Sequence, residues 1–268
     1  MKLSRIVLVL LVLALAAAPA LAAEKTFGLG LQFDTGARDM AFDDFTTSLG
    51  KLTSDEITQM DKFYDYKETY HSLALLGTWN INSNFTARAI LGLSDYELKG
   101  DYFGDQSNAF VGFKMSDDYS DFIYGLELDF KGPITDSWAV GLSLAGKAIS
   151  YRDGSYSVNG TQVLPGGAVT RVDVDTQKWA IEFFPRVVYT GKKVDLYIGP
   201  TYTMANAEME VRQYTTAGVT TSTLTLNEEE PWAVRVGVCL PLGQNIKTDI
   251  AVNFLGTTGA TISASYGF

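Results

Sequence analysis

The sequence predicts an all-β protein: a transmembrane, antiparallel, up-and-down β-barrel of about ten strands. Three observations predict this fold. Apolar residues alternate with polar or small ones in ten segments, short and long links alternate between the segments, and aromatic residues gather beside the short links. Side chains of a strand point alternately to opposite faces, so each segment gives a strand with one apolar and one polar face.

The first 22 residues do not share this pattern. Lys2 and Arg5 precede an apolar run, and residues 20–22 (Ala-Leu-Ala) form a small-residue cleavage site. This arrangement is typical of a secretory signal peptide. A membrane-anchor helix is the alternative, but the run is short for a bilayer span. We therefore expect a signal peptide at residues 1–22 and one barrel domain at residues 23–268.

The strand segments follow one another along the rest of the chain. In the first, TFGLGLQFD, the residues Phe27, Leu29, Leu31 and Phe33 share one face. The ten segments lie at residues 26–34, 70–79, 85–93, 124–130, 138–146, 178–189, 194–204, 232–240, 250–254 and 262–268. An even number of strands returns both ends of the chain to the same side of a membrane.

The links between segments alternate in length. Short links are expected at residues 80–84, 131–136, 191–193 and 243–245, and long polar ones at 38–66, 99–117, 152–176 and 213–227. The last link, at residues 256–259, should be short but on the side of the long ones. A soluble sandwich or lipocalin-like barrel, with its apolar face inward, is the alternative. Aromatic residues beside the short links favour a membrane barrel, in which such rings settle at the interface. They are Trp79, Phe130, Trp138, Tyr189 and Phe268.

The chain ends in TISASYGF, with Ile262, Ala264, Tyr266 and Phe268 on one face. This ending resembles that of Gram-negative outer-membrane β-barrel proteins, such as the small opacity- or porin-like barrels. In that family a terminal Phe, with an aromatic residue two positions before it, is a signal for the barrel-assembly machinery. The resemblance implies insertion into the cell outer membrane from the periplasm, with short periplasmic turns and long extracellular loops. It also implies contact with outer-membrane lipid and lipopolysaccharide, and we expect a monomer.

The composition narrows the range of partners. Without Lys2 and Arg5 the chain has 19 basic residues (21 − 2) against 31 acidic ones, a net charge near −12. Such a charge disfavours nucleic-acid binding. Cys239 is the only cysteine, which excludes an internal disulfide and a cysteine-based zinc site. The sequence suggests no metal, cofactor or catalytic site.

The polar face of the segments carries charges of both signs. These residues should meet inside one lumen and form a charge network: Asp34, Arg88, Glu127, Asp129, Lys147, Lys178, Glu182, Arg186, Asp195, Arg235 and Asp249. Unpaired charges in a narrow barrel are costly, so we expect hydrogen-bonded pairs. The network would either close the lumen or act as a selectivity constriction. About ten strands leave a bore little wider than its side chains, which favours closure.

The leading hypothesis is therefore an outer-membrane barrel with a structural or narrow-pore role, and not an enzyme. One alternative is a surface adhesin or receptor that acts through acidic external loops, which include Asp43, Asp55 and Asp61. Another is an outer-membrane hydrolase or acyltransferase. Barrel enzymes of this kind, the omptin proteases and the lipid A acyltransferases and deacylases, resemble one another in needing a His near the outer rim. His71 is the only His here, but Ser72 follows it directly and so points to the opposite face.

Overall fold

The computed structural model describes residues 27–47, 50–51, 53, 55, 64–102, 113–152, 155–158, 161–162, 169–243 and 245–268; the predicted signal peptide lies outside these ranges. The strands in the described ranges are β1 (Phe27–Thr47), β2 (Gly50–Lys51), β3 (Tyr64–Asn80), β4 (Phe85–Tyr102), β5 (Phe113–Pro133), β6 (Trp138–Arg152), β7 (Ser155–Val158), β8 (Thr161–Gln162), β9 (Val169–Thr190), β10 (Asp195–Thr215), β11 (Gly218–Glu228), β12 (Trp232–Pro241), β13 (Ile246–Phe254) and β14 (Thr258–Gly267). In these parts of the chain no helix has the length and hydropathy needed to cross a bilayer.

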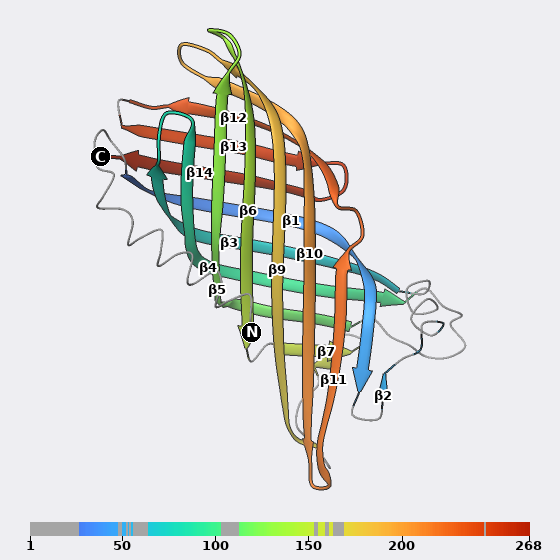
Figure 1. Ribbon diagram of the computed structural model, residues 1–268. Coiled ribbons are helices and arrows are strands. Elements are labelled where there is room, and N and C mark those ends of the chain that lie inside the picture. Colours follow the sequence, from blue (N-terminus) through green and yellow to red (C-terminus); the bar gives the residue numbers. More distant parts are fainter. Residues whose placement is uncertain are drawn as a thin grey trace.

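Ten of the strands close into a ring in the order β4-β3-β1-β14-β13-β12-β10-β9-β6-β5, and β5 pairs back to β4. The first and last strands close it, from the pair Gly28–Gly267 to the pair Ala37–Thr258. In Figure 1 the strands β6, β9 and β10 of the front wall cross β1, β3 and β12–β14 of the back wall. All neighbours in the ring are antiparallel. The predicted barrel of about ten strands is confirmed.

The links are partly as predicted. Within the described residues the short links are confirmed as tight turns, with residue 244 of one link outside these ranges. In the first of them the backbone N–H of Ile81 donates to the carbonyl of Phe85 at 2.9 Å. The long links are wrong in length, because strands continue far into them. β1 runs on to Thr47, β9 begins at Val169 and β10 runs on to Thr215.

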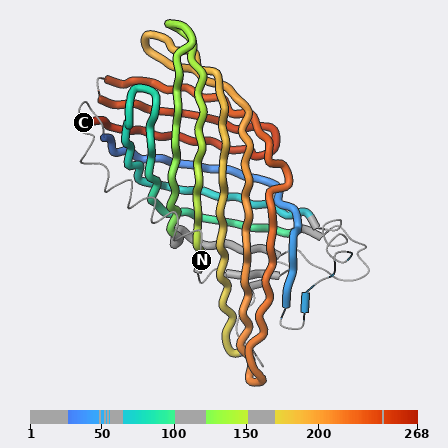
Figure 2. Tube along the Cα trace, in the orientation of Figure 1, coloured from blue at the N-terminus to red at the C-terminus, as the bar shows by residue number. Residues whose placement is uncertain are grey.

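One strand, β11, lies within a predicted long link except for its last residue, Glu228. It pairs with β10 from Asn206–Asn227 to Thr215–Gly218, and with β1 from Met40–Glu228 to Thr47–Ser222. Strands β9, β10 and β11 run far past the ends of β12, β13 and β14 (Figure 2). Beyond the ten-strand section, one strand therefore takes the place of three. We call β11, with the parts of β1, β3, β4, β5, β6, β9 and β10 beyond the ends of β12–β14, the extension.

The polarity of the two faces inverts between the ten-strand section and the extension. At the start of β10 the outward residues Leu196 and Ile198 are about half exposed, while the inward position Thr201 is buried. Further along the same strand Glu208 faces outward and Met209 faces inward. The alternation of faces is unbroken, so the exchange of apolar and polar residues reflects a change of surroundings.

The larger apolar cluster of the described residues lies inside the extension. Its members are buried inward-facing residues of eight strands, namely Met40, Phe42, Tyr66, Tyr96, Leu98, Ile123, Ile149, Val174, Ala207, Met209, Val211, Leu224 and Leu226. Most large apolar residues of the ten-strand section are instead exposed on the outside, as Leu29, Leu75 and Leu91 show, although Ala74, Leu76 and Ile90 form a small buried cluster inside it. This outward apolar face is the one that the alternation predicts.

Inward-facing glycines let large inward side chains lie flat against the barrel wall. A Cβ on Gly237 would come within 2.2 Å of the ring of Tyr197, and a Cβ on Gly141 within 2.8 Å of Arg186 Nε. The Tyr197 ring also packs edge-on against Phe184, with centroids 5.9 Å apart, so it has little freedom to move. The glycine-rich inner face is thus space that Tyr197 and Arg186 fill.

Replacing Gly237 should therefore destabilise the barrel. We expect Gly237→Ala to lower the free energy of unfolding by about 1–3 kcal/mol, the range for an overpacked interior. Gly146→Ala is the control, because a Cβ there meets nothing within 4 Å. It should leave stability unchanged or raise it by up to about 1 kcal/mol. Urea titration of refolded protein measures both, and equal effects would contradict this account of the inner glycines.

Candidate functional site: the filled lumen

The lumen of the ten-strand section is crossed by ion pairs between strands. Arg88 of β4 faces Glu127 of β5, its register partner, at 2.5 Å. Lys147 of β6 reaches Asp34 of β1 at 2.9 Å, although 113 residues separate them. Each cation is therefore matched by a carboxylate, which offsets the cost of removing both from water.

Arg235 of β12 and Glu182 of β9 form the best-oriented pair. The two terminal guanidinium nitrogens donate to the two carboxylate oxygens at 2.7 and 2.5 Å. Nε of the same guanidinium donates to Asn253 Oδ1 at 2.7 Å. Its Cζ atom lies 4.8 Å from the centroid of the Phe184 ring. A two-point pair of this kind fixes both side chains in direction as well as in distance.

Arg186 of β9 forms the centre of a second group. It donates to Asp129 Oδ1 and to Ser143 Oγ, both at 2.6 Å, and Ser143 donates to the same Asp129 oxygen at 2.5 Å. Arg186 and Asp129 are both more than four-fifths buried. Next to this group, Tyr197 donates its hydroxyl to Asp249 Oδ1 at 2.7 Å.

A third charged group lies where the ten-strand section meets the extension. Glu68 is fully buried and forms ion pairs with Lys178 and Arg38. Arg38 also pairs with Glu228 of β11, and Thr257 donates to Glu228 at 2.7 Å. This junction cluster joins β1, β3, β9, β11 and the turn before β14.

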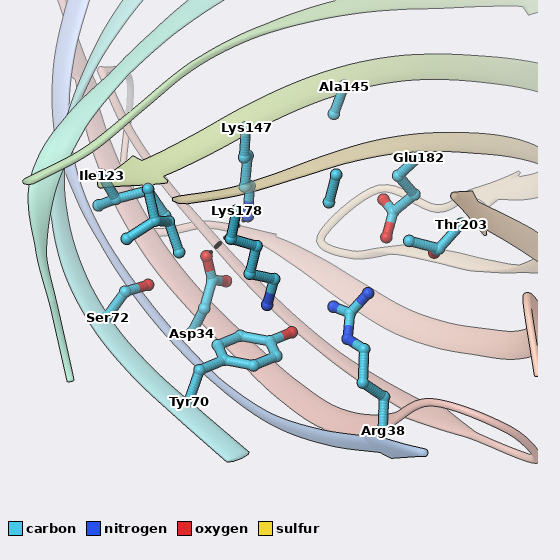
Figure 3. Close-up of a pocket in the computed structure, with 12 residues that line it drawn as sticks. Asp34, Arg38, Tyr70, Ser72, Ile123, Ala145, Lys147, Lys178, Glu182 and Thr203 are labelled. Atoms are coloured by element: carbon cyan, nitrogen blue, oxygen red, sulfur yellow. Dashed lines mark hydrogen bonds and ion pairs between the residues drawn. The ribbon is translucent and has the colours of Figure 1, made fainter. Parts of the chain in front are cut away.

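Aromatic rings cover the junction cluster. Lys178 Nζ lies 4.9 Å from the centroid of Tyr70 and 5.4 Å from that of Tyr96. Figure 3 shows Lys178 pointing toward Tyr70, with Lys147 and Asp34 joined beside it. The space that these side chains leave is a cavity of about 70 Å³. Such a volume is far below that of a typical small-molecule pocket, so the lumen is filled at this level.

The predicted lumen residues all lie on ring strands, but their partners could not be assigned from the sequence. The structure pairs Arg88 with Glu127, Arg186 with Asp129, Arg235 with Glu182, Lys147 with Asp34, and, nearer the short turns, Lys131 with Asp195. Asp249 instead accepts from Tyr197, and Lys178 pairs with Glu68.

Sequence reasoning missed Arg38, Glu68 and Glu228, since two of them fall in or at the edge of predicted long links. A signal was present: Arg38 continues the inward alternation of Asp34. It also missed that the extension is filled by apolar side chains rather than by charges.

His71 lies on the outward face, where its Nδ1 is 2.8 Å from Thr35 Oγ1. Ser72, by contrast, is buried and points inward. Asp95 is the register partner of His71 on the other side, yet no carboxylate of the described residues lies within ion-pair distance of the imidazole. The Thr35 hydroxyl beside His71 is one group that a hydrolase could use. The described residues place no acid where it would orient the imidazole ring, as such an enzyme needs.

The C-terminal residues continue the outward face of β14. Tyr266 and Phe268 are about half exposed, and their ring centroids are 6.4 Å apart. The backbone N–H of Phe268 donates to the carbonyl of Phe27 at 2.9 Å. Phe268 thus takes part in closing the ring; its role as an assembly signal, with Ile262, Ala264 and Tyr266, stays a prediction. No three His, Cys, Asp or Glu side chains in the described part of the chain converge as metal ligands.

Comparison with known proteins finds similarity of architecture. No protein-family model matches the chain, and no curated protein sequence matches it. The structure is similar to the outer membrane protease OmpT from Escherichia coli (11% identity, TM-score 0.45, covering 91% of this chain and 97% of that one). It is also similar to the outer membrane protein OprG from Pseudomonas aeruginosa (11% identity, TM-score 0.41, covering 91% of this chain and 97% of that one). A third similar structure is the translocator domain of the autotransporter NalP from Neisseria meningitidis (10% identity, TM-score 0.43, covering 94% of this chain and 92% of that one). Their roles differ, and similarity at this level does not select among them.

The buried pairs predict a stability difference within the lumen. Arg186→Met strands the buried Asp129 carboxylate and should lower the free energy of unfolding by about 3–5 kcal/mol. Lys131→Met breaks the Lys131–Asp195 pair, in which each side chain is about one-third exposed, and should cost less than about 1 kcal/mol. Urea titration of the two variants in the same lipid vesicles compares them. A loss for Lys131→Met as large as that for Arg186→Met would show that burial does not decide the cost.

Proposed function

We propose that the protein is an integral outer-membrane β-barrel that does not conduct solutes and that holds a folded extension outside the membrane. The observation that carries this proposal is that the lumen is closed twice in series. Ion pairs cross the ten-strand section, and an apolar core of thirteen buried residues fills the extension. A continuous aqueous path would have to pass both.

The outward face of the ten-strand section supports a position in a membrane. Large apolar side chains cover it on every strand of the ring, and many of them are about half exposed. A soluble protein rarely leaves so large an apolar surface in contact with water. Because the barrel is closed, its backbone groups are paired within the ring, as lipid surroundings require.

Aromatic pairs mark the end of this surface that lies beside the short turns. Phe27 stacks on Trp79 at 6.4 Å, Phe85 lies 4.9 Å from Phe130, and Trp138 lies 5.3 Å from Tyr189. At the opposite end of the band Tyr202 lies 4.8 Å from Trp232. Aromatic side chains at both ends of an apolar band are typical of the interfaces of membrane barrels. Together with the resemblance of the C-terminus, they support the outer membrane as the location.

Two outward positions on β3 test this placement. Leu75→Arg should lower the free energy of unfolding in lipid vesicles by about 2–4 kcal/mol, because it puts a charge in the apolar band. Thr69→Arg lies on the same face of the same strand, beyond the band, and should change it by less than about 1 kcal/mol. Folding yields and urea titration in vesicles measure the difference. Equal costs at the two positions would place the band elsewhere.

Closure in series makes a distinct prediction for conductance. Wild-type protein in planar bilayers should show little or no single-channel current. Arg186→Ala should behave alike, because the apolar core of the extension stays closed when the ion pairs below it are broken. Lys131→Ala, which leaves both closures intact, is the control. A large and stable wild-type conductance would overturn the proposal in favour of a porin.

A second candidate, a surface receptor or adhesin, is favoured by one observation. Strands β9, β10 and β11 project past the rest of the ring and carry polar residues outward on a packed core (Figure 1). Part of the predicted acidic loop, including Asp61, lies outside the described residues. Cutting the β10–β11 hairpin back to the pair Val211–Ser222 would abolish attachment to host cells if this candidate holds, and conductance would be unaffected.

A further inference from the structure

The ladder between β9 and β10 is interrupted at one place within the apolar band. The two strands pair up to Ile198–Val187 and again from Tyr202–Phe183, with the same register on both sides of the interruption. Three residues of each strand have no partner across this boundary, namely Phe184–Arg186 of β9 and Gly199–Thr201 of β10. On their other sides both stretches are fully paired, β9 with β6 and β10 with β12. We call these six residues the proline seam.

Two prolines directly opposite each other cause the interruption. The register places Pro200 of β10 opposite Pro185 of β9. The N–H of Thr203 donates toward the start of β12, and N–H groups alternate in direction along a strand, so position 200 would donate toward β9. Thr190 donates to Ser137 beside β6, so by the same alternation position 185 would donate toward β10. Because proline has no N–H, neither of these two bonds can form.

The proline seam lies in the part of the wall that faces the membrane. Pro200 is exposed on the outer face, and Ile198 and Val187, beside it on that face, are each about half exposed. In lipid surroundings no water replaces a missing backbone bond. Proline is accordingly rare in central strands, where it removes a ladder bond. The closed ring thus includes one place where backbone hydrogen bonds do not join neighbouring strands.

Side chains on the inner face join β9 to β10 and β12 at this level. The Tyr197 ring of β10 packs against the buried Phe184 ring of β9, with centroids 5.9 Å apart. Arg186 Cζ of β9 lies 5.8 Å from the centroid of Tyr197. The two-point pair between Glu182 of β9 and Arg235 of β12 spans β10, which lies between those strands. These contacts bridge the seam from the lumen side.

We propose that the proline seam is a conformational device, a place where the barrel wall opens locally while the ladders on both sides stay paired. Glu182 and Arg235 form its latch, because their ion pair spans the seam. Local opening occurs where few bonds must break, and across the seam side-chain contacts rather than backbone bonds oppose it. The inference goes beyond the proposed function and does not depend on whether the lumen conducts.

Amide hydrogen exchange of the full-length barrel in lipid nanodiscs, read at each residue by NMR, tests the device. Val187 and Val188 are neighbours of one residue type; the N–H of Val187 is directed toward β10 beside the seam, and that of Val188 toward β6. The protection factor of the Val187 amide should be roughly tenfold lower than that of Val188, because the two bonds next to it are missing. In the double variant Pro185→Val/Pro200→Val, which restores both donors, the two values should agree within a few-fold.

The latch has its own test in the same experiment. Glu182→Gln keeps the shape of the side chain and removes its charge, so it should lower the protection of Val187 by roughly a further tenfold. Glu127→Gln is the matched control, because it weakens an ion pair of the same kind, with Arg88, between β4 and β5. It should leave Val187 unchanged. With both prolines replaced, Glu182→Gln should change the protection of Val187 by no more than a few-fold.

The outcomes are distinct. Equal protection of Val187 and Val188 in the wild type overturns the device, and so does the absence of exchange at both amides, since a seam that opens must exchange. Equal effects of Glu182→Gln and Glu127→Gln overturn the latch, because they would reflect a general loosening of the barrel. If the double proline variant does not fold, Pro200→Val alone decides, with a roughly threefold rise in Val187 protection expected from one restored bond. The experiment does not involve conductance, so a conducting barrel would overturn the proposed closure and leave the seam standing.

Discussion

The fixed alternation of side chains along a strand is the constraint on which the rest of the structure depends. In a closed barrel every residue faces either the lumen or the surroundings, and a strand cannot exchange its faces without a bulge. When a strand passes from one kind of surrounding to another, its two faces must therefore exchange polarity in sequence. Strand β10 does so between Met204, exposed and apolar, and Glu208, exposed and charged. The extension follows from this exchange.

The two sections need different fillings for the same reason. In the ten-strand section the surroundings are apolar, so burying apolar side chains in the lumen gives no advantage. The lumen can hold charged residues such as Arg186 and Asp129, provided that each is paired. Ion pairs of this kind add little net stability but set which strands can face each other, because a mismatched register would leave a charge alone. Where the outside is polar, each apolar side chain buried inside contributes about 1.5–3 kcal/mol. The extension can thus hold its shape as a water-soluble domain does, by a core that includes Met40 and Leu226.

The sequence alone predicted the ten-strand section well and the extension poorly. Strands were recognised by apolar residues on the outward face, such as Leu29 and Leu31, so a strand seemed to end where that face became polar. The segment TLTLN of β11 alternates as strictly as any other, but with its apolar residues, Leu224 and Leu226, turned inward. Partners across the bore were beyond prediction for another reason. Whether Lys147 meets Asp34 or Glu182 depends on the stagger with which the ring closes, and no local pattern specifies it.

The junction cluster consists of charged side chains that lie between the ion-paired lumen of the ten-strand section and the apolar core of the extension. Where β12, β13 and β14 end and β11 takes their place, the backbone ladder is interrupted, and neither lipid nor an apolar core can satisfy the polar groups that remain. Backbone bonds satisfy part of the ladder there: the N–H of Glu229 donates to the carbonyl of Asp39 at 3.2 Å, and the N–H of Thr203 donates to the carbonyl of Pro231 at 2.8 Å. The side chains of the junction cluster join the same strands: Arg38 reaches Glu228 on β11 and Glu68 on β3, while Thr257 hydrogen-bonds Glu228 from the turn before β14. Because these buried charges are paired with one another, removing one of them would leave its partner unpaired, at a cost of about 3–5 kcal/mol. The junction cluster therefore fixes the strands at the level where the ten-strand barrel continues as a narrower one.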